Sequence, residues 1–551
     1  MWMGRVALVG MTVMMVGAVR PWSLAVGSQA EPCLVATLQG DVRGIDRGSS
    51  CEFRAVPYGA STAGARRWAP PVPAVPWAPV TLDATVATPP VCPQINPAGA
   101  VVGTEDCLKL HIWAPHRSSG PPLPVIVWLH PGSFVAASAG IAPQNGTRFV
   151  EEADTVVVAP NYRLGPFGFL GHGALRTENP DYPSAGNYGF LDQRLALEWV
   201  RTHIGAFGGD PDRITIAGQS AGGLSVSLHL VSPGSHGTFE RAIMQGGFAS
   251  YRWRTREDGE AQGDAFASAL GCTDPSLVLA CLRSRTREEV VRALPTGTEQ
   301  FAETGRTHWS PVVDGLVIPD EPRTLFEIGA FSRVPVIIGS NRDEGWTWVT
   351  RSFPGEMTQE QYETALGTEF GPDAPAILQA YPTAEYSSPK NALAHAVTDA
   401  EYACGAARLS RLVERTNTPV YLYQFEYSLD VLAGRAVHGL DVNFVFGTTV
   451  SAPVLPPPST YPLSPDDLDL FRSIAGYWRR FADTGNPNVD DDTAVHWQLF
   501  NRPADDGRGA DKYLILDRPI RVEKRLREAQ CAFWEPYFFR SITAAVPAHT
   551  P

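Results

Sequence analysis

The chain has 551 residues, of which 44% are hydrophobic and 19% charged, and this composition excludes a disordered, collagen-like or coiled-coil protein. It carries 45 basic and 58 acidic side chains, a formal net charge of −13, with no long run of one sign. A basic surface for a phosphate backbone is therefore not expected, and nucleic acid is not a predicted partner.

The N-terminus has the layout of a secretory signal peptide. Arg5 precedes an uncharged apolar run over residues 6–19, and small residues follow around Gly27 and Ala30. The run is too short to cross a hydrocarbon core about 30 Å thick, which disfavours the alternative of an uncleaved anchor. We predict that residues 1–30 are cleaved near Gly27 or Ala30, leaving a secreted chain with no stable membrane anchor.

The chain contains eight cysteines, all beyond residue 30, and none forms a C-x-x-C pair of the redox or zinc-ribbon kind. In an exported protein they are expected to form disulfides. Their spacing suggests four pairs, three of them close in sequence: Cys33 with Cys51, Cys92 with Cys107, Cys272 with Cys281, and Cys404 with Cys531. Eight cysteines allow 105 pairings, so spacing alone leaves the connectivity open.

Short apolar runs bounded by turn residues recur along the chain and predict strands buried on both faces. They span residues 125–129, 155–160, 214–217, 242–244, 334–338 and 420–425. Segments of helical period lie between them, as in 191–203, where Leu191, Leu195 and Trp199 form one apolar face. The alternation predicts an α/β fold in which helices cover both sides of a mostly parallel sheet. We expect residues 31–551 to form a single domain with insertions.

A turn on which a serine could act as a nucleophile follows the strand at 214–217. The residues are Gly218-Gln219-Ser220-Ala221-Gly222, a G-x-S-x-G motif, and a small, apolar helix start comes next. In this strand-turn-helix setting, the glycines let strand and helix approach a strained turn that presents the serine above the sheet edge. The pattern predicts Ser220 as a catalytic nucleophile.

A serine hydroxyl needs a base, and in this arrangement an acid and then a histidine follow the serine along the chain. The strand at 334–338 runs into Asp343 and Glu344, and spacing does not decide between these two acids. Among the later histidines, only His438 stands in a glycine-flanked loop soon after a core strand. We therefore predict His438 as the base.

The remaining requirement of acyl transfer is a set of donors for the oxyanion. The strand at 125–129 ends in a tight turn that contains Pro131, Gly132 and Ser133. Because Pro131 has no N–H, the predicted donors are the backbone N–H groups of Gly132 and Ser133, with a third from Ala221.

No metal or organic cofactor is predicted, because a serine nucleophile with a base needs neither. The pair His111 and His116 has no accompanying ligand spacing of the kind that marks a metal site.

Ordered motifs run over nearly the whole mature chain: EDCL at 105–108, GNYGFLDQ at 186–193, AFGGDP at 206–211, PVVDG at 311–315, FVFG at 444–447, FADTGNP at 481–487 and CAFW at 531–534. Together they resemble the motifs of the type-B carboxylesterase and cholinesterase family. The resemblance implies the α/β-hydrolase fold and a triad of Ser220, Glu344 and His438, since the acid of the family's NxxEG motif falls on Glu344. It also implies the last three cysteine pairs given above, with Cys33 and Cys51 as an additional pair.

The activity that the resemblance implies is that of a secreted serine carboxylesterase, which cleaves small-molecule carboxylic esters through an acyl-enzyme intermediate. Two alternatives remain, a non-catalytic adhesion or binding protein on the same fold and a lipase, although the sequence shows no clear apolar lid.

Three departures from the family pattern bear on the site. Gln219 replaces the usual glutamate, which removes a negative charge beside the imidazole. Asp441 replaces another usual glutamate. The segment 92–107 contains no tryptophan, whereas cholinesterases place a cation-binding tryptophan there, so neutral esters are expected to be preferred over choline esters.

Overall fold

The computed structural model describes residues 31–116, 120–248, 253–295, 309–450, 460–488, 495–500 and 511–538. The predicted signal peptide lies outside the described residues.

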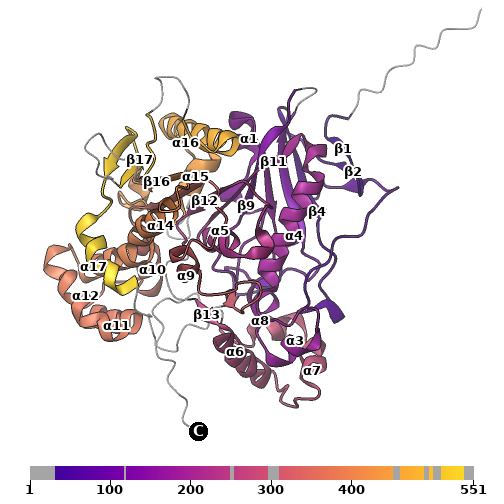
Figure 1. Cartoon of the computed structure of the whole chain (residues 1–551), viewed down its shortest axis with the longest axis horizontal. Coiled ribbons are helices and arrows are strands. Elements are labelled where there is room, and N and C mark those ends of the chain that lie inside the picture. The colour runs from indigo at the N-terminus through magenta and orange to yellow at the C-terminus, as the bar shows by residue number, and fades with distance from the viewer. Residues whose placement is uncertain are drawn as a thin grey trace, which may run out of the picture.

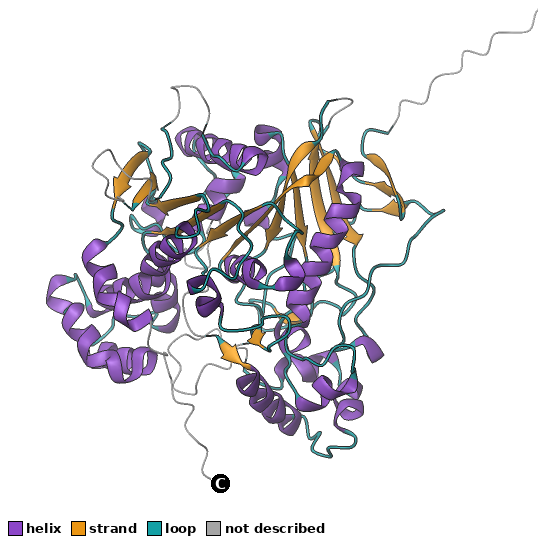
Figure 2. Ribbon diagram, in the orientation of Figure 1, coloured by secondary structure: helices purple, strands orange, loops and turns teal. Residues whose placement is uncertain are grey.

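A sheet of 11 strands crosses the molecule (Figures 1 and 2). In spatial order the strands are β18 (Arg521–Lys524), β17 (Lys512–Leu516), β16 (Val420–Phe425), β15 (Val336–Asn341), β12 (Arg241–Gln245), β11 (Gly209–Gln219), β9 (Leu123–Leu129), β10 (Val156–Pro160), β8 (Lys109–Pro115), β4 (Ser50–Pro57) and β3 (Ile45–Asp46). The strands from β17 to β10 pair in parallel, and β18, β8, β4 and β3 add antiparallel margins. The prediction of an α/β fold with a mostly parallel sheet is confirmed.

Smaller strands pair outside this sheet. They are β1 (Leu34–Thr37), β2 (Gly40–Arg43) and β5 (Leu82–Asp83) in one group, β6 (Gln94–Ile95) with β7 (Val101–Val102), and β13 (Arg254–Thr255) with β14 (Val312–Val313).

The apolar strands face two separate cores, as their composition predicts. In β9, Val125, Val127 and Leu129 pack into one core, whereas Ile126 and Trp128 pack into the other. Successive side chains of a strand point to opposite faces, so a strand covered on both sides must be apolar at every position. The alternation therefore accounts for the uninterrupted apolar runs in the sequence.

Helices cover both faces of the sheet. One core includes α4 (Tyr188–His203) and α5 (Ala221–Val231), and the other includes α1 (Thr147–Ala153), α15 (Leu440–Phe446) and α16 (Pro465–Thr484). The remaining helices are α2 (Gly165–Phe169), α3 (Gly173–Glu178), α6 (Arg256–Ala269), α7 (Val278–Ser284), α8 (Arg287–Arg292), α9 (Pro322–Glu327), α10 (Glu344–Ser352), α11 (Gln359–Phe370), α12 (Ala374–Ala380), α13 (Pro389–Val397), α14 (Cys404–Glu414) and α17 (Glu528–Phe538). Figure 1 shows α10, α11, α12 and α17 gathered on one side, where they enclose a third core.

One strand is displaced from its predicted position. The apolar run at 334–338 predicts a strand, but β15 begins at Val336 and continues to Asn341. Proline has no N–H to donate to a sheet, and residue 335 is a proline. The strand therefore starts after Pro335 and carries its polar end toward Asp343 and Glu344.

Four disulfides join Cys33 to Cys51, Cys92 to Cys107, Cys272 to Cys281, and Cys404 to Cys531. Structural disulfides are typical of proteins that fold in an oxidising compartment. The bridges differ widely in the length of chain they close: 127 residues separate Cys404 from Cys531, but only 9 separate Cys272 from Cys281. Within the described ranges, no helix combines the length and apolar character needed to cross a bilayer.

This difference in loop length leads to a prediction about stability. The entropy of loop closure gives about 5 kcal/mol for the long loop and about 2.5 kcal/mol for the short one. Replacing Cys404 and Cys531 by alanine should therefore lower the free energy of unfolding by about twice as much as replacing Cys272 and Cys281. Denaturant titration of the two double variants measures both values, and equal losses would contradict the loop-entropy explanation.

Candidate active site

Ser220 occupies a strained turn between β11 and α5. Its backbone angles are φ 56° and ψ −123°, a conformation that a residue with a side chain rarely adopts. The surrounding backbone is close enough to require glycine. A Cβ atom at Gly222 would lie 2.0 Å from the carbonyl oxygen of Leu129, and one at Gly247 would lie 2.2 Å from that of Ser220. The glycines therefore make this turn possible.

The turn is held by its backbone and leaves the hydroxyl available. The N–H of Ser220 donates to the carbonyl of Gln245 at 2.9 Å, and the carbonyl of Ser220 accepts from the N–H of Leu224 at 2.9 Å. The Ser220 side chain is partly exposed. Within the described part of the chain, its hydroxyl has no protein hydrogen-bond partner, so a substrate could approach it directly.

Glu344 and His438 lie in direct contact, although 94 residues separate them. The Oε2 atom of Glu344 is 2.5 Å from Nδ1 of His438, and Oε1 accepts from the backbone N–H of Asn341 at 2.8 Å. Glu344 is the first residue of α10 and is only 1% exposed. Because both carboxylate oxygens are engaged, the acid is fixed, and Nδ1 of the neutral imidazole is the donor to it. The other ring nitrogen, Nε2, is left as an acceptor.

The acceptor nitrogen of His438 faces the turn that carries Ser220. The amide nitrogen of Gln219 lies 3.2 Å from Nε2 of His438, so the amide donates to the imidazole. Gln219 is buried, with 2% of its surface exposed, and it immediately precedes Ser220. Hydrogen bonds thus join His438 to Glu344 and to Gln219. Ser220, the candidate nucleophile, is the next residue after Gln219.

The other acid candidate, Asp343, is engaged differently. Its Oδ2 atom is 3.0 Å from the guanidinium of Arg342 and accepts from the backbone N–H of Ala436 at 2.9 Å. The bond to Ala436 ties the start of α10 to the loop that leads to His438. Asp343 therefore holds that loop, whereas Glu344 contacts the imidazole.

A buried polar network that the sequence did not predict lies behind the acid. Asp441 accepts from the amide of Gln245 at 2.8 Å, from the hydroxyl of Tyr423 at 2.9 Å and from the amide of Asn341 at 3.2 Å. Burial, with the nearby charge of Glu344, raises the pKa of the Asp441 carboxyl, and the three hydrogen bonds oppose that rise. Asn341 donates to both Glu344 and Asp441, so the network connects these two carboxylates.

The turn after β9 supplies backbone donors beside Ser220. Gly132 has φ 117°, Ser133 has φ 54°, and a Cβ atom at Gly132 would lie 2.1 Å from the carbonyl oxygen of Ala136. Leu129 pairs with Gly218 in the sheet, so this turn and the serine turn leave the sheet at the same edge. Among the described residues, the N–H groups of Gly132, Ser133 and Ala221 have no protein acceptor. They are therefore available to an oxyanion.

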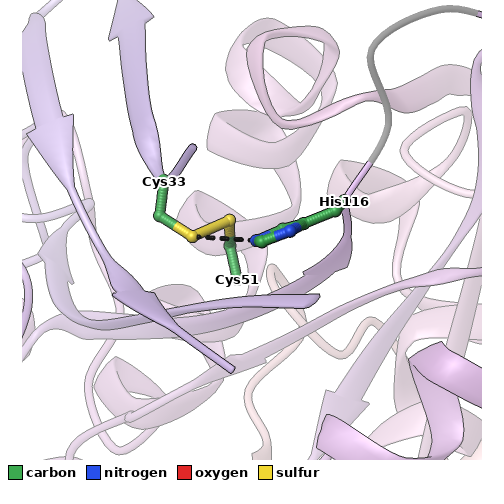
Figure 3. Close-up of side chains that lie close together, drawn as sticks. All are labelled: Cys33, Cys51 and His116. Carbon is green, nitrogen blue, oxygen red and sulfur yellow. Dashed lines mark hydrogen bonds between the residues drawn. A yellow bond between two sulfur atoms is a disulfide. The ribbon is translucent and has the colours of Figure 1, made fainter. Parts of the chain in front are cut away.

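One cluster of side chains resembles a metal site in composition. In the described ranges, Cys33, Cys51 and His116 are the only group of three whose ligand atoms lie within 4.8 Å of one another. Figure 3 shows the imidazole of His116 beside the disulfide, with Nε2 3.3 Å from Sγ of Cys33. Both sulfur atoms are engaged in the disulfide, so neither is a thiolate ligand.

Comparisons with known proteins agree on one family over nearly the whole chain. The profile of the carboxylesterase family matches residues 31–534. The chain is 30% identical to an acetylcholinesterase of Bungarus fasciatus, over 93% of this chain and 87% of that protein. It is 32% identical to a para-nitrobenzyl esterase of Bacillus subtilis (89% and 96%) and 29% identical to carboxylesterase 1C of Rattus norvegicus (92% and 94%). The chain therefore belongs to the carboxylesterase family and is a carboxylic ester hydrolase.

Proposed function

We propose that this protein hydrolyses small neutral carboxylic esters with Ser220 as nucleophile, His438 as general base and Glu344 as the acid that orients the base. The main support is the buried hydrogen bond of 2.5 Å between Glu344 and His438 at the sheet edge where the Ser220 turn lies. A histidine oriented by a buried carboxylate, beside a serine on a strained turn, is the arrangement that activates a hydroxyl.

In the proposed reaction, Nε2 of His438 takes the proton of Ser220 as the hydroxyl oxygen attacks the ester carbonyl. Glu344 stabilises the imidazolium that forms. The N–H groups of Gly132, Ser133 and Ala221 bind the oxyanion of the tetrahedral intermediate. His438 then returns the proton to the leaving alcohol, and an acyl-enzyme remains. Water, activated by the same histidine, attacks the acyl group and releases the carboxylic acid.

For Nε2 to take this proton, the amide of Gln219 must give up its hydrogen bond to the same nitrogen. That bond is 3.2 Å long and neutral, so its loss costs only about 1 kcal/mol. Gln219 also leaves the base without a neighbouring carboxylate on the serine side. The missing charge removes one attraction for a cationic alcohol, which supports neutral esters over choline esters as substrates.

We also propose that the chain is exported, with residues 1–30 as its signal peptide. The four disulfides support this, since they require an oxidising environment to form. N-terminal sequencing of the protein recovered from the medium of its source cells tests the cleavage near Gly27 or Ala30.

Ser220→Ala should abolish ester hydrolysis and leave the fold intact, because the hydroxyl contributes to the reaction and makes no hydrogen bond to any residue that the structure describes. We expect kcat to fall by about 10⁴-fold or more. Hydrolysis of p-nitrophenyl acetate by the purified variant, with a melting curve as the control for folding, measures this. A variant that keeps most of its activity would exclude Ser220 as the nucleophile.

Gly132→Ala should lower kcat by about 100-fold or more, because the added Cβ would meet the carbonyl of Ala136 and displace an oxyanion donor. The matched control is Ser133→Gly, which keeps the N–H at a position with φ 54° that glycine adopts freely. We expect this control to retain activity within a few-fold. Equal losses of activity in the two variants would show that displacement of a backbone donor does not explain the loss in Gly132→Ala.

Gln219→Glu should move the acidic limb of kcat/KM to higher pH, by about one unit. The new carboxylate would lie beside Nε2 of His438 and favour the imidazolium. Activity requires the neutral imidazole and is lost as the pH falls, so the variant loses it earlier in an acid titration. Gln219→Met, which removes the same amide hydrogen bond and adds no charge, is the control for that loss and should move the limb less than Gln219→Glu does. A limb that stays in place or moves to lower pH in Gln219→Glu would contradict this account.

A further inference from the structure

Two aromatic side chains flank the imidazole of His438, and the proposed mechanism assigns a role to neither. The ring centroid of Trp348 lies 5.2 Å from that of His438, with 50° between the ring planes. The ring of Tyr402 lies 5.4 Å from His438 at 60°. A hydrogen bond joins the two aromatic residues, since the indole N–H of Trp348 donates to the hydroxyl of Tyr402 at 2.7 Å.

The acid and the first aromatic residue come from the same helix. Glu344 begins α10, and Trp348 follows four residues later, one helical turn along the same face. A single rigid element therefore places a carboxylate on Nδ1 of His438 and an indole beside its ring. This spacing is visible in the sequence, but the partner of the indole is not.

The second aromatic residue comes from an irregular helix that packs against the start of α10. Tyr402 lies in the π-helical segment Thr398–Ala403, and it is 7% exposed. The N–H of Gly345 donates to the hydroxyl of Thr398 at 2.9 Å, and a Cβ atom at Gly345 would lie 2.4 Å from the carbonyl of Ala394. Single π-helical turns inside helices occur frequently at functional sites. This close contact fixes Tyr402 relative to Glu344.

We propose that Trp348 and Tyr402 are positioning residues for His438, an inference that rests on the proposed function of His438 as the base. The hydrogen bond to Glu344 fixes Nδ1 but still allows the ring to turn about the axis from Nδ1 to Oε2. The rings of Trp348 and Tyr402 pack against the imidazole and are joined by their own hydrogen bond. They therefore oppose this rotation of the imidazole and keep Nε2 directed at the Ser220 turn. Their π systems also attract the imidazolium that forms during acyl transfer.

The test removes the hydrogen bond between the two residues and keeps both rings. Trp348→Phe and Tyr402→Phe should each lower kcat by about 5-fold, the effect of one lost hydrogen bond, with KM little changed. Because each variant breaks the same bond, the double variant should be only slightly slower than either single one. The rate at which a fluorophosphonate phosphonylates Ser220, with loss of fluoride, should fall in parallel with kcat.

A matched control comes from a second Trp–Tyr pair, outside the two rings that flank His438. The indole N–H of Trp534 donates to the hydroxyl of Tyr381 at 2.7 Å, in the core formed with α17. Trp534→Phe breaks a bond of the same kind and length, and it should lower the melting temperature while leaving kcat at the wild-type value. If Trp534→Phe lowered kcat as much as Trp348→Phe, the effect would be one of stability and the positioning role would be wrong.

The outcomes separate this inference from the proposed function. Wild-type kcat in both Trp348→Phe and Tyr402→Phe would overturn the positioning role, as would strictly multiplicative losses in the double variant. If His438→Ala kept the wild-type rate of phosphonylation by the fluorophosphonate, the proposed base itself would be wrong.

Discussion

Close passage of backbone over backbone at the edge of the sheet is the constraint on which the site depends. The end of β9 and the end of β11 are paired neighbours, and the turns that follow them cross within contact distance. A Cβ atom at Gly222 would meet the carbonyl of Leu129 at 2.0 Å, and one at Gly218 would meet Gly222 itself at 2.5 Å. Only glycine permits this approach. The result is that the Ser220 hydroxyl and the N–H groups of Gly132 and Ser133 leave the sheet at one place.

The sheet also determines how His438 and Glu344 reach that place. β15 and β16 pair in parallel and end at the same edge, β15 shortly before Glu344 and β16 thirteen residues before His438. The loop after β16 returns to the start of α10 through Asp343, whose carboxylate accepts from the backbone N–H of Ala436. Two residues further on, His438 meets Glu344. Asp343 does not contact the imidazole, but it thus helps to position it.

The buried polar residues behind the site satisfy one another. Asp441 would be costly to bury alone, but three donors surround it, from β12, β15 and β16. The network joins the ends of three core strands to α15, the helix that follows His438. We infer that it holds the His438 loop against the sheet.

Much of the fold could be predicted from the sequence, because a strand covered on both faces must be apolar at every position, as in residues 125–129 and 420–425. The candidates for the nucleophile, acid and base also came from chain order and local motifs. Spacing alone could not separate Asp343 from Glu344, since adjacent residues differ only in which way their side chains turn. Nor could it reveal the contact of Trp348 with Tyr402, because these residues are distant in the chain and have no motif of their own. The place of Gln219 beside the imidazole came instead from the family resemblance.

Mapping the covalent adduct formed by a fluorophosphonate tests the central claim most directly. Peptide mass spectrometry of the labelled protein identifies the modified residue, and the labelling rate reports how well the base activates it. We expect a single adduct on Ser220, formed at least 100-fold more slowly in His438→Ala and more slowly in Glu344→Gln. An adduct on another residue, or labelling of Ser220 at the same rate without His438, would contradict the assignment of these residues.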